Sequence, residues 1–160
     1  MPIVLLRVDE RLIHGQVVVG WGQALGLQRV VVVDDELAAA PWEQELYRLG
    51  VPPEWEVIFV SVDEAAPRWP AWADEPARTA VLLRDVTTLA RLADRVDLRG
   101  TTVNLGGLHA RPDRQRVLPY LFLGEDERTQ LRRLAERGIA IEARDVPAAP
   151  AVPLTELAPV

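Results

Sequence analysis

The sequence Arg7-Val8-Asp9-Glu10-Arg11-Leu12-Ile13-His14-Gly15-Gln16 joins a short apolar run to a longer apolar-rich segment. The run before it, Ile3 to Leu6, has the length and aliphatic composition of a buried strand. The segment after it, Val17 to Leu25, has the length of a helix. We therefore expect a strand, a polar loop and a helix, which is the first repeating unit of an α/β sheet.

This polar loop contains the side chains that phosphoryl chemistry requires. Two Arg, two carboxylates and one imidazole lie within eight residues, and Gly15 directly follows the imidazole of His14. A ring nitrogen can attack phosphorus, guanidinium groups can hold phosphoryl oxygens, and a carboxylate can fix the ring tautomer. The start of the helix adds backbone N–H donors and a partial positive charge. The loop thus predicts a phosphoryl-acceptor site at His14.

The composition predicts a single globular domain. A chain of 160 residues with 49% hydrophobic and 26% charged residues can bury a sizeable core. No apolar run approaches the roughly 20 residues that span a bilayer, and the first residues do not have the pattern of a secretory signal peptide. We therefore expect a cytoplasmic protein.

Residue usage excludes several classes of chemistry. The chain has no cysteine, which excludes disulfides, thiol catalysis and Cys-ligated zinc. All 18 basic residues are Arg, so neither a Schiff-base lysine nor a Walker A lysine is available. The net charge of −6 argues against nucleic-acid binding and against binding to anionic membranes.

Strand and helix patterns alternate along the chain. Aliphatic runs predict strands at residues 3–7, 29–34, 56–61, 79–83, 101–105 and 139–143, with a short strand at 118–123. Helices are expected at residues 14–25, 34–49, 86–95 and 125–137. The prolines at 67, 70 and 76 predict an irregular or only briefly helical connection. The alternation predicts a mainly parallel sheet covered by helices on both faces.

Residues 7–17 resemble the phosphorylation-site segment of the enzyme IIB subunits of the mannose/fructose/sorbose family of the sugar phosphotransferase system. Four later segments are similar to family segments and follow in the family's order: 30–38, 60–65, 103–109 and 137–142. The resemblance extends over residues 3 to about 146. It implies a single IIB domain at residues 1–146. The Pro/Ala-rich composition of residues 147–160 predicts a mobile or partner-dependent tail.

The family resemblance also implies a specific fold. We expect a three-layer α/β/α domain with a doubly wound central sheet of six to seven strands, in which strand 1 lies between strands 4 and 5. Ligands bind such sheets at the carboxyl ends of strands, where the connections diverge. The loops after strands 1, 4 and 5 would then converge: the His14 loop, Arg84-Asp85, and residues 106–116.

By the same resemblance, the chain is a cytoplasmic phosphoryl carrier. It would accept phosphate from a phosphohistidine of enzyme IIA onto His14 and transfer it to a sugar, the activity of a protein-histidine–sugar phosphotransferase. Its other partner would be a membrane-embedded IIC/IID permease, with which it associates peripherally. The resemblance implies no dissociable cofactor or metal and suggests Nδ1 as the attachment atom. Whether the protein forms a homodimer is left open.

The loop residues then have expected roles. Arg11 and Arg7 stabilise the phosphoryl charge, although Arg7 could instead be a partner for Asp9 or Glu10. Asp9 either orients the imidazole or holds Arg11, and Glu10 is expected to be a solvated surface charge.

Five further residues are expected to bind the phosphate: Gly15, Gln16, Arg84, Gly106 and Gly107. Gly15 and Gln16 stand at the start of the helix, where backbone N–H groups are unpaired. The Gly106-Gly107 pair marks a close backbone approach, either to the phosphoryl group or to a neighbouring segment.

Three other groups have weaker claims to chemistry. The acids Asp34-Asp35-Glu36 could bind a metal but are better explained as a helix cap, and Ser61 could cap the next helix. The chain's other imidazole, His109, precedes a basic segment that includes Arg111, Arg114 and Arg116, and we expect it to lie at the surface.

Two rival functions remain open at this point. The first is a regulatory phosphate-binding or anion-binding protein that inherited a IIB pocket. The second is a metal-dependent hydrolase that uses His14, Asp9 and Asp35.

Overall fold

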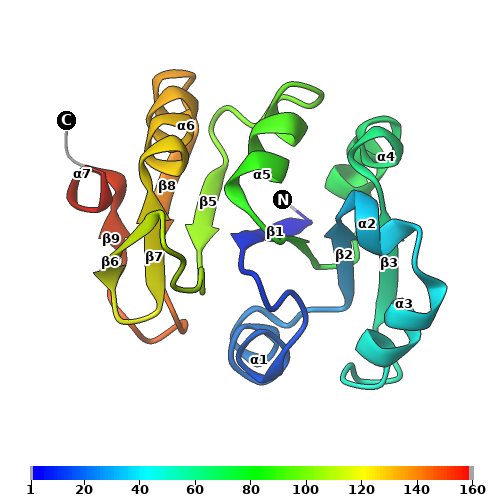
Figure 1. Ribbon diagram of the computed structural model, residues 1–160. Helices are drawn as coiled ribbons and strands as arrows, with labels where there is room; N and C mark the ends of the chain where they lie inside the picture. Colours follow the sequence, from blue (N-terminus) through cyan, green and yellow to red (C-terminus); the bar gives the residue numbers. More distant parts are fainter. Residues whose placement is uncertain (1, 159–160) are drawn as a thin grey trace.

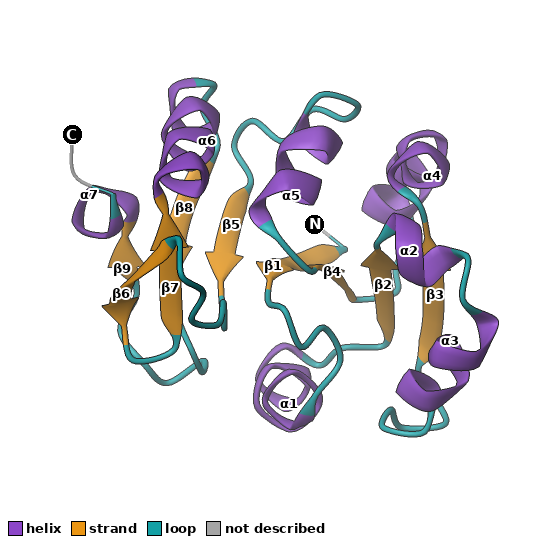
Figure 2. Ribbon diagram, viewed as in Figure 1, coloured by secondary structure: helices purple, strands orange, loops and turns teal. Residues whose placement is uncertain are grey.

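The computed structural model describes residues 2–158, which form a central sheet between two layers of helices (Figures 1 and 2). The sheet has the order β3-β2-β4-β1-β5-β8-β9. Its strands are β1 (Ile3–Val8), β2 (Arg29–Val33), β3 (Glu56–Val60), β4 (Thr79–Leu83), β5 (Thr102–Leu105), β8 (Ala140–Ala143) and β9 (Val152–Pro153). All neighbours are parallel except β9, which is antiparallel to β8. Strand β1 lies between β4 and β5, as expected.

Helices pack on both faces of this sheet. They are the π-helix η1 (Gln16–Trp21), α1 (Gly22–Leu25), α2 (Asp35–Ala38), α3 (Pro41–Arg48), α4 (Val62–Asp74), α5 (Val86–Ala93), α6 (Glu125–Glu136) and α7 (Leu154–Leu157). One core cluster combines β-strand side chains with α4, α5 and α6, and a second combines them with η1, α2 and α3. Every residue of β2 and β4 is buried, which explains why their sequences are continuous apolar runs. Within residues 2–158, no helix combines the length and apolar character needed to cross a bilayer.

The helix expected at residues 14–25 has two parts. Residues 16–21 form the π-helix η1, and α1 continues it to Gly26, which has φ 61° and ends the helix in the left-handed conformation. A π-helical segment is rare and is frequently found at a functional site.

Proline divides one expected helix but does not interrupt another. The helix expected at residues 34–49 is split into α2 and α3, because Pro41 suits the first turn of a helix and cannot continue one. The prediction of an irregular connection around Pro67 and Pro70 is wrong, since both lie inside the continuous helix α4. A capping box at Ser61 starts α4, and the burial of Trp72 holds it against the sheet.

Two segments near the C-terminus also differ from expectation. The short strand expected at 118–123 is the turn and second strand of an antiparallel hairpin, β6 (Arg114–Leu118) with β7 (Leu121–Gly124), outside the main sheet. The segment after Val146, for which composition predicts a mobile or partner-dependent tail, packs against the domain as far as residue 158. It adds β9 to the sheet edge and buries Leu157 from α7. Residues 159–160 of that expected tail, like Met1, lie outside the described residues.

Candidate functional site

The loops that follow β1, β4 and β5 meet at the end of β1. The backbone N–H of Asp9 donates to the carbonyl of Leu83, 2.9 Å away, at the end of β4. The backbone N–H of Glu10 donates to the carbonyl of Gly107, also at 2.9 Å, in the loop after β5. The expected convergence of these loops is confirmed, and it places residues 9–16 at the switch point of the sheet.

A strained turn brings His14 back towards the end of β1. Leu12 has φ 55°, and it is the one non-glycine residue at positive φ within residues 2–158. Its side chain is fully buried, and its N–H donates to the carbonyl of Asp9 at 3.0 Å. Left-handed backbone is costly for a leucine and persists where packing over-determines it, often beside a functional group.

Asp9 is the centre of the site. Its carboxylate is buried, and Oδ1 accepts hydrogen bonds from the backbone N–H of Arg11 at 3.0 Å and from Nε of Arg11 at 3.1 Å. Oδ2 accepts from Nη2 of Arg11 at 3.0 Å and from Nη2 of Arg7 at 3.1 Å, and it lies 3.1 Å from Nε2 of His14. The sequence left two roles open for Asp9, and in this geometry it contacts both the imidazole and Arg11.

The charge of Asp9 selects the tautomer of His14. Burial opposes ionisation of Asp9, but the hydrogen bonds from His14 and Arg11 and the charge of Arg7 outweigh it and hold the pKa of Asp9 well below its ordinary value. An ionised carboxylate only accepts hydrogen bonds, so Nε2 of His14 carries the proton that faces it. In this tautomer the lone pair of the ring is on Nδ1. The side chain of His14 is 15% exposed.

Arg11 lies at the surface beside this pair. Its side chain is 36% exposed, and its hydrogen bonds to Asp9 raise the pKa of Arg11. Nη2 also donates to Oε1 of Gln16 at 3.0 Å, which ties Arg11 to the start of η1. Within residues 2–158, no hydrogen-bond partner is found for Nη1 of Arg11, so this edge of the guanidinium can bind an anion.

Arg7 is buried, and this corrects its expected role as a phosphate-binding fork. Nη1 donates to Oδ1 of Asn104 and to the carbonyl of Arg144, and Nη2 donates to Asp9 and to the carbonyl of Asp145. Burial lowers the pKa of Arg7. Its side chain has no exposed surface, so it cannot meet a phosphoryl group and instead acts as a partner for Asp9, the alternative that the sequence left open.

The two glycines after β5 permit this close packing. A Cβ atom at Gly106 would lie 2.5 Å from both Cζ of Arg7 and Oδ2 of Asp9, a contact that real Cβ atoms do not make. At Gly107, a Cβ would lie 3.2 Å from Nη2 of Arg11. Of the two explanations for this glycine pair, close approach to a neighbouring segment therefore holds at Gly106.

Gly15 and Arg84 have different surroundings. Gly15 has φ −53° and precedes η1, and a Cβ there would meet no atom within 4 Å, so its surface is open. Arg84 pairs with Asp34 at 3.4 Å. In the part of the chain that the structure describes, no hydrogen bond joins Arg84 to His14, and the expectation that Arg84 binds phosphate gains no support from its contacts.

The acidic turn after β2 is a helix cap, as the sequence favours. Asp34 accepts a hydrogen bond from the N–H of Leu37 at 2.9 Å. Asp35 accepts from the N–H of Val62 at 2.9 Å and pairs with Arg91 at 2.8 Å. These partners hold Asp35 at the start of α2, and neither of them is His14 or Asp9, with which the hydrolase alternative would combine it. Ser61 caps α4.

The contacts of Glu10 could not be predicted from the sequence. It is not a solvated surface charge, because only 11% of its side chain is exposed. Nδ1 of His109 lies 2.9 Å from its carboxylate, Arg111 lies 3.4 Å away, and Nη1 of Arg114 lies 2.5 Å away. The side chain of Arg114 is 2% exposed and also pairs with Glu127 at 2.8 Å. This network joins the His14 loop to the β6–β7 hairpin and α6, and no local sequence signal could have revealed partners about a hundred residues away.

Two hollows are lined in part by residues that contact Glu10. The smaller, of about 250 Å³, is lined by residues that include Arg11, Gln16, Gly107, His109, Tyr120 and Asp145. The expected surface position of His109 is confirmed, and burial raises the pKa of Tyr120.

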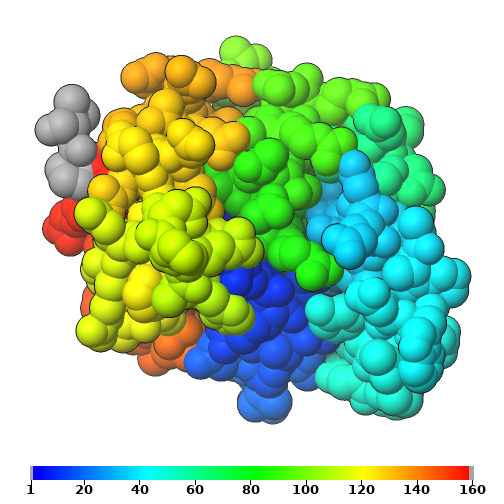
Figure 3. All heavy atoms as spheres, viewed as in Figure 1, coloured from blue at the N-terminus to red at the C-terminus, as the bar shows by residue number. Residues whose placement is uncertain are grey.

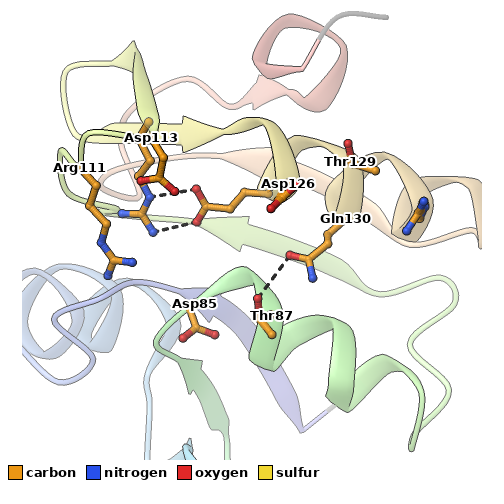
Figure 4. Close-up of a pocket in the computed structure, with 10 residues that line it drawn as sticks. Asp85, Thr87, Arg111, Asp113, Asp126, Thr129 and Gln130 are labelled. Carbon is orange, nitrogen blue, oxygen red and sulfur yellow. Dashed lines mark hydrogen bonds and ion pairs between the residues drawn. The ribbon is translucent and has the colours of Figure 1, made fainter.

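The larger hollow, of about 500 Å³, lies between α5, α6 and the segment that precedes β6 (Figure 4). Asp85, Arg111 and Asp126 contribute to its lining. Arg114 and Glu127 also line it and are joined by two hydrogen bonds. Its lining mixes both charges. The smaller hollow has Arg11 and Gln16 on its wall and is the one that reaches the His14 loop.

The sequence matches a family model described as the PTS system sorbose subfamily IIB component over residues 3–159. It is 30% identical to the sorbose-specific EIIB component of Klebsiella pneumoniae, with 95% of this chain and 92% of that protein covered. It is 31% identical to the mannose-specific EIIAB component of Escherichia coli K12, with 98% of this chain and 48% of that protein covered. The chain therefore spans about half the length of this EIIAB relative.

Solved structures agree with the sequence comparison. The crystal structure of the IIBSor domain of the sorbose permease from Klebsiella pneumoniae has a TM-score of 0.86 and 28% identity, covering 98% of this chain and 96% of that one. The structure of manxB from Thermoanaerobacter tengcongensis has a TM-score of 0.86 and 30% identity, covering 96% and 93%. The family match spans nearly the whole chain and includes the loop that carries His14. The chain therefore belongs to the sorbose/mannose family of IIB components of the sugar phosphotransferase system.

Proposed function

We propose that this chain is the phosphoryl carrier between enzyme IIA and a transported sugar, and that Nδ1 of His14 is the acceptor atom. The observation that carries the proposal is the 3.1 Å contact between Nε2 of His14 and the buried carboxylate of Asp9. That contact keeps the proton on Nε2 and leaves the lone pair on Nδ1. Membership of the IIB family supports the reaction class.

The first step is transfer from a phosphohistidine of IIA. The lone pair on Nδ1 of His14 attacks phosphorus, the P–N bond of the donor breaks, and its electron pair returns to the donor ring. The developing positive charge on the His14 ring is stabilised by the Asp9 carboxylate. The open edge of Arg11 binds phosphoryl oxygens, while its other edge is held by Asp9 and Gln16. The backbone N–H groups at Gly15 and Gln16 are further donors at the start of η1.

The second step passes the phosphoryl group to the sugar. A sugar hydroxyl oxygen attacks phosphorus, the P–N bond to His14 breaks, and the ring recovers its Nδ1 lone pair while the hydroxyl proton leaves to solvent or to a base of the permease. In this role Asp9 is a positioning residue for the ring, and Arg7 in turn positions Asp9. The chemistry requires no dissociable cofactor, because the group travels covalently and Arg11 supplies the positive charge.

The proposed reaction requires two protein partners. IIB components of the phosphotransferase system work with IIA proteins or domains and with IIC/IID permeases. For this chain we place the IIA donor on one side of the reaction and a sugar bound by a membrane-embedded IIC/IID permease on the other. The protein would work at the cytoplasmic face of that permease.

The test is phosphate transfer to defined histidine variants. The native protein, His14→Ala and His109→Ala are each incubated with phosphorylated IIA, and intact mass and acid lability are measured. We expect one acid-labile phosphate on the native protein and on His109→Ala, and none on His14→Ala. Phosphate on His14→Ala would overturn the assignment. Tight anion binding by the native protein without any phosphate transfer would favour the regulatory-binder alternative.

A further inference from the structure

The π-helix η1 contacts both arginines of the site, one with each end. The carboxylate of Asp9 and the side chains that contact it, Arg7, Arg11 and His14, are called the Asp9 cluster here. Gln16, the first residue of η1, accepts a hydrogen bond from Nη2 of Arg11 at 3.0 Å. Trp21, the last residue of η1, has the guanidinium of Arg7 over its ring, with Cζ 5.4 Å from the ring centroid. Since both arginines donate to Oδ2 of Asp9, η1 supports this carboxylate from two sides.

The π-helical geometry explains how both ends of η1 reach one cluster. In an α-helix, two residues five positions apart point in directions that differ by about 140°. In a π-helix the hydrogen bond spans five residues, so the first and sixth side chains lie nearly on the same side. Such a bond joins the N–H of Gly22 to the carbonyl of Val17. Gln16 and Trp21 are five positions apart and therefore both face the Asp9 cluster.

Trp21 holds Arg7 in two ways. Its buried ring attracts the guanidinium by a cation–π contact, which is stronger where water is excluded. Its Nε1 also donates to the carbonyl of Asp145 at 3.2 Å, and the same carbonyl accepts from Nη2 of Arg7 at 3.2 Å. Figure 3 shows the C-terminal segment that contains Asp145, in orange, against the N-terminal segment, in blue. Trp21 therefore fixes Arg7 and one of the acceptors of Arg7.

The position of Arg7 determines the position of the Asp9 carboxylate. The side chain of Arg7 has no exposed surface, and in the described part of the chain Asp9 is the one carboxylate that forms an ion pair with it. Among the same residues, no hydrogen-bond partner is found for Nε of Arg7. Its orientation therefore depends on the contacts of its two Nη atoms and on the ring of Trp21. A shift of this guanidinium would move Oδ2 of Asp9, which lies 3.1 Å from Nε2 of His14.

We propose that Trp21 is a positioning residue for His14 and that it acts through Arg7 and Asp9. This inference rests on the proposed function of His14. The contacts run from the ring of Trp21 to the guanidinium of Arg7, from there to the Asp9 carboxylate, and from Asp9 to Nε2 of His14. They determine the tautomer of the imidazole and the direction in which Nδ1 points. Trp21 therefore affects the chemical step of phosphoryl transfer and not the binding of the donor protein.

The test replaces Trp21 and measures both the tautomer of His14 and its rate of phosphorylation. Trp21→Leu removes the ring from Arg7 and the hydrogen-bond donor from the carbonyl of Asp145. We expect nitrogen-15 NMR to show a smaller fraction of His14 with its proton on Nε2. We also expect kcat for phosphorylation by phosphorylated IIA to fall at least about tenfold while KM is unchanged. Trp21→Phe keeps a ring beside Arg7 and should keep the tautomer, with kcat lower by about threefold because one hydrogen bond is lost.

Trp72 supplies the matched control. It is a buried tryptophan of α4, and Cζ of the exposed Arg68 lies 5.1 Å from its ring centroid. Trp72→Leu and Trp72→Phe therefore remove the same chemical groups, including a cation–π contact, from a part of the core outside the Asp9 cluster. Both control variants should lower the melting temperature and leave the tautomer of His14 and the value of kcat unchanged.

Three results would overturn the inference. Trp21→Leu with the native tautomer ratio and the native kcat would show that the ring does not position His14. An equal loss of the tautomer preference in the Trp72 variants would show a general effect of lost packing. If Trp21→Leu does not fold, Trp21→Phe is compared with Trp72→Phe, and equal kcat values for these two variants would refute the role of Trp21.

Failure of the proposed function would be seen separately. In that case the native protein itself gains no phosphate at His14 from phosphorylated IIA. The tautomer of His14 does not depend on any donor, so its comparison between the Trp21 and Trp72 variants still decides whether Trp21 positions the imidazole.

Discussion

Replacing Asp9 by Asn tests how strongly the site depends on one buried charge. The side chains have nearly the same shape, so the change removes the charge without leaving a cavity. In the native protein the two carboxylate oxygens accept hydrogen bonds from Arg7, Arg11 and His14. Whichever way the Asn amide is placed, its NH2 group faces at least one of these donors, and the guanidinium of Arg7 loses the charge that compensates it inside the protein.

The expected loss of stability follows from burial. Breaking a buried ion pair by removing one partner costs about 3–5 kcal/mol. Arg11 is partly exposed and can recover hydrogen bonds to water, so the lower end applies, and we expect the free energy of unfolding to fall by about 3 kcal/mol at pH 7. For a domain of this size that corresponds to a melting temperature lower by roughly 6–12 °C.

The same variant should change the dependence of stability on pH. The pKa of Asp9 is lower in the folded protein than in the unfolded chain. Its contribution is therefore fully present above the unfolded value, about 3.9, and is lost as the pH falls through the folded value. The difference in stability between native protein and Asp9→Asn should be constant from neutral pH down to that region and shrink below it.

Urea unfolding at a series of pH values measures this difference directly. Asp97→Asn is the matched control, because Asp97 pairs with Arg99 at the surface and its replacement should leave the free energy of unfolding nearly unchanged. Nitrogen-15 NMR of the native protein should show the proton of His14 on Nε2, and Asp9→Asn should lose that preference. A stability difference below about 1 kcal/mol at pH 7, where 3–5 is typical of a broken buried pair, or one that persists unchanged in acid, would refute the reasoning.

Three further substitutions test individual contacts. Gly106→Ala should lower the free energy of unfolding by about 1–3 kcal/mol, because the added methyl group overpacks the contact with Arg7 and Asp9. Gly15→Ala places its methyl group in open space and should leave the free energy of unfolding unchanged. Equal urea midpoints for the two variants would contradict this packing. Arg11→Lys should fold normally but accept phosphate from IIA at least about tenfold more slowly, because an ammonium group cannot hold Asp9 and two phosphoryl oxygens at once. An unchanged rate of phosphate transfer in rapid-quench measurements would show that Arg11 only supports the loop. Glu10→Gln should lower the free energy of unfolding by about 1–3 kcal/mol, because Arg114 loses a charged hydrogen-bond partner. The same variant should be phosphorylated more slowly both by IIA and by phosphoramidate, a small-molecule phosphoryl donor. A melting temperature equal to that of the native protein would show that the contacts of Glu10 do not hold the loop.

The local pattern of residues was sufficient to predict most of the elements and the polar loop after β1. Strand β4 has the predicted bounds, and the other parallel strands differ from prediction by one residue at an end. Such strands can be recognised in the sequence because consecutive aliphatic side chains indicate a strand that is buried on both faces of the sheet. The contacts of Asp9 with Arg11 and His14 could be anticipated because these residues lie within eight positions of one another.

The surroundings of those residues depended on contacts between distant parts of the chain. Arg7 and Glu10 have similar local sequence context, yet Arg7 meets Asn104, 97 positions away, and Glu10 meets Arg114, 104 positions away. Whether a charged side chain faces solvent or a buried partner is set by the segments that the fold brings over it, and no property of the neighbouring residues encodes them. The same reason applies at the C-terminus, where composition predicts mobility but the edge of β8 offers unpaired backbone groups that β9 fills.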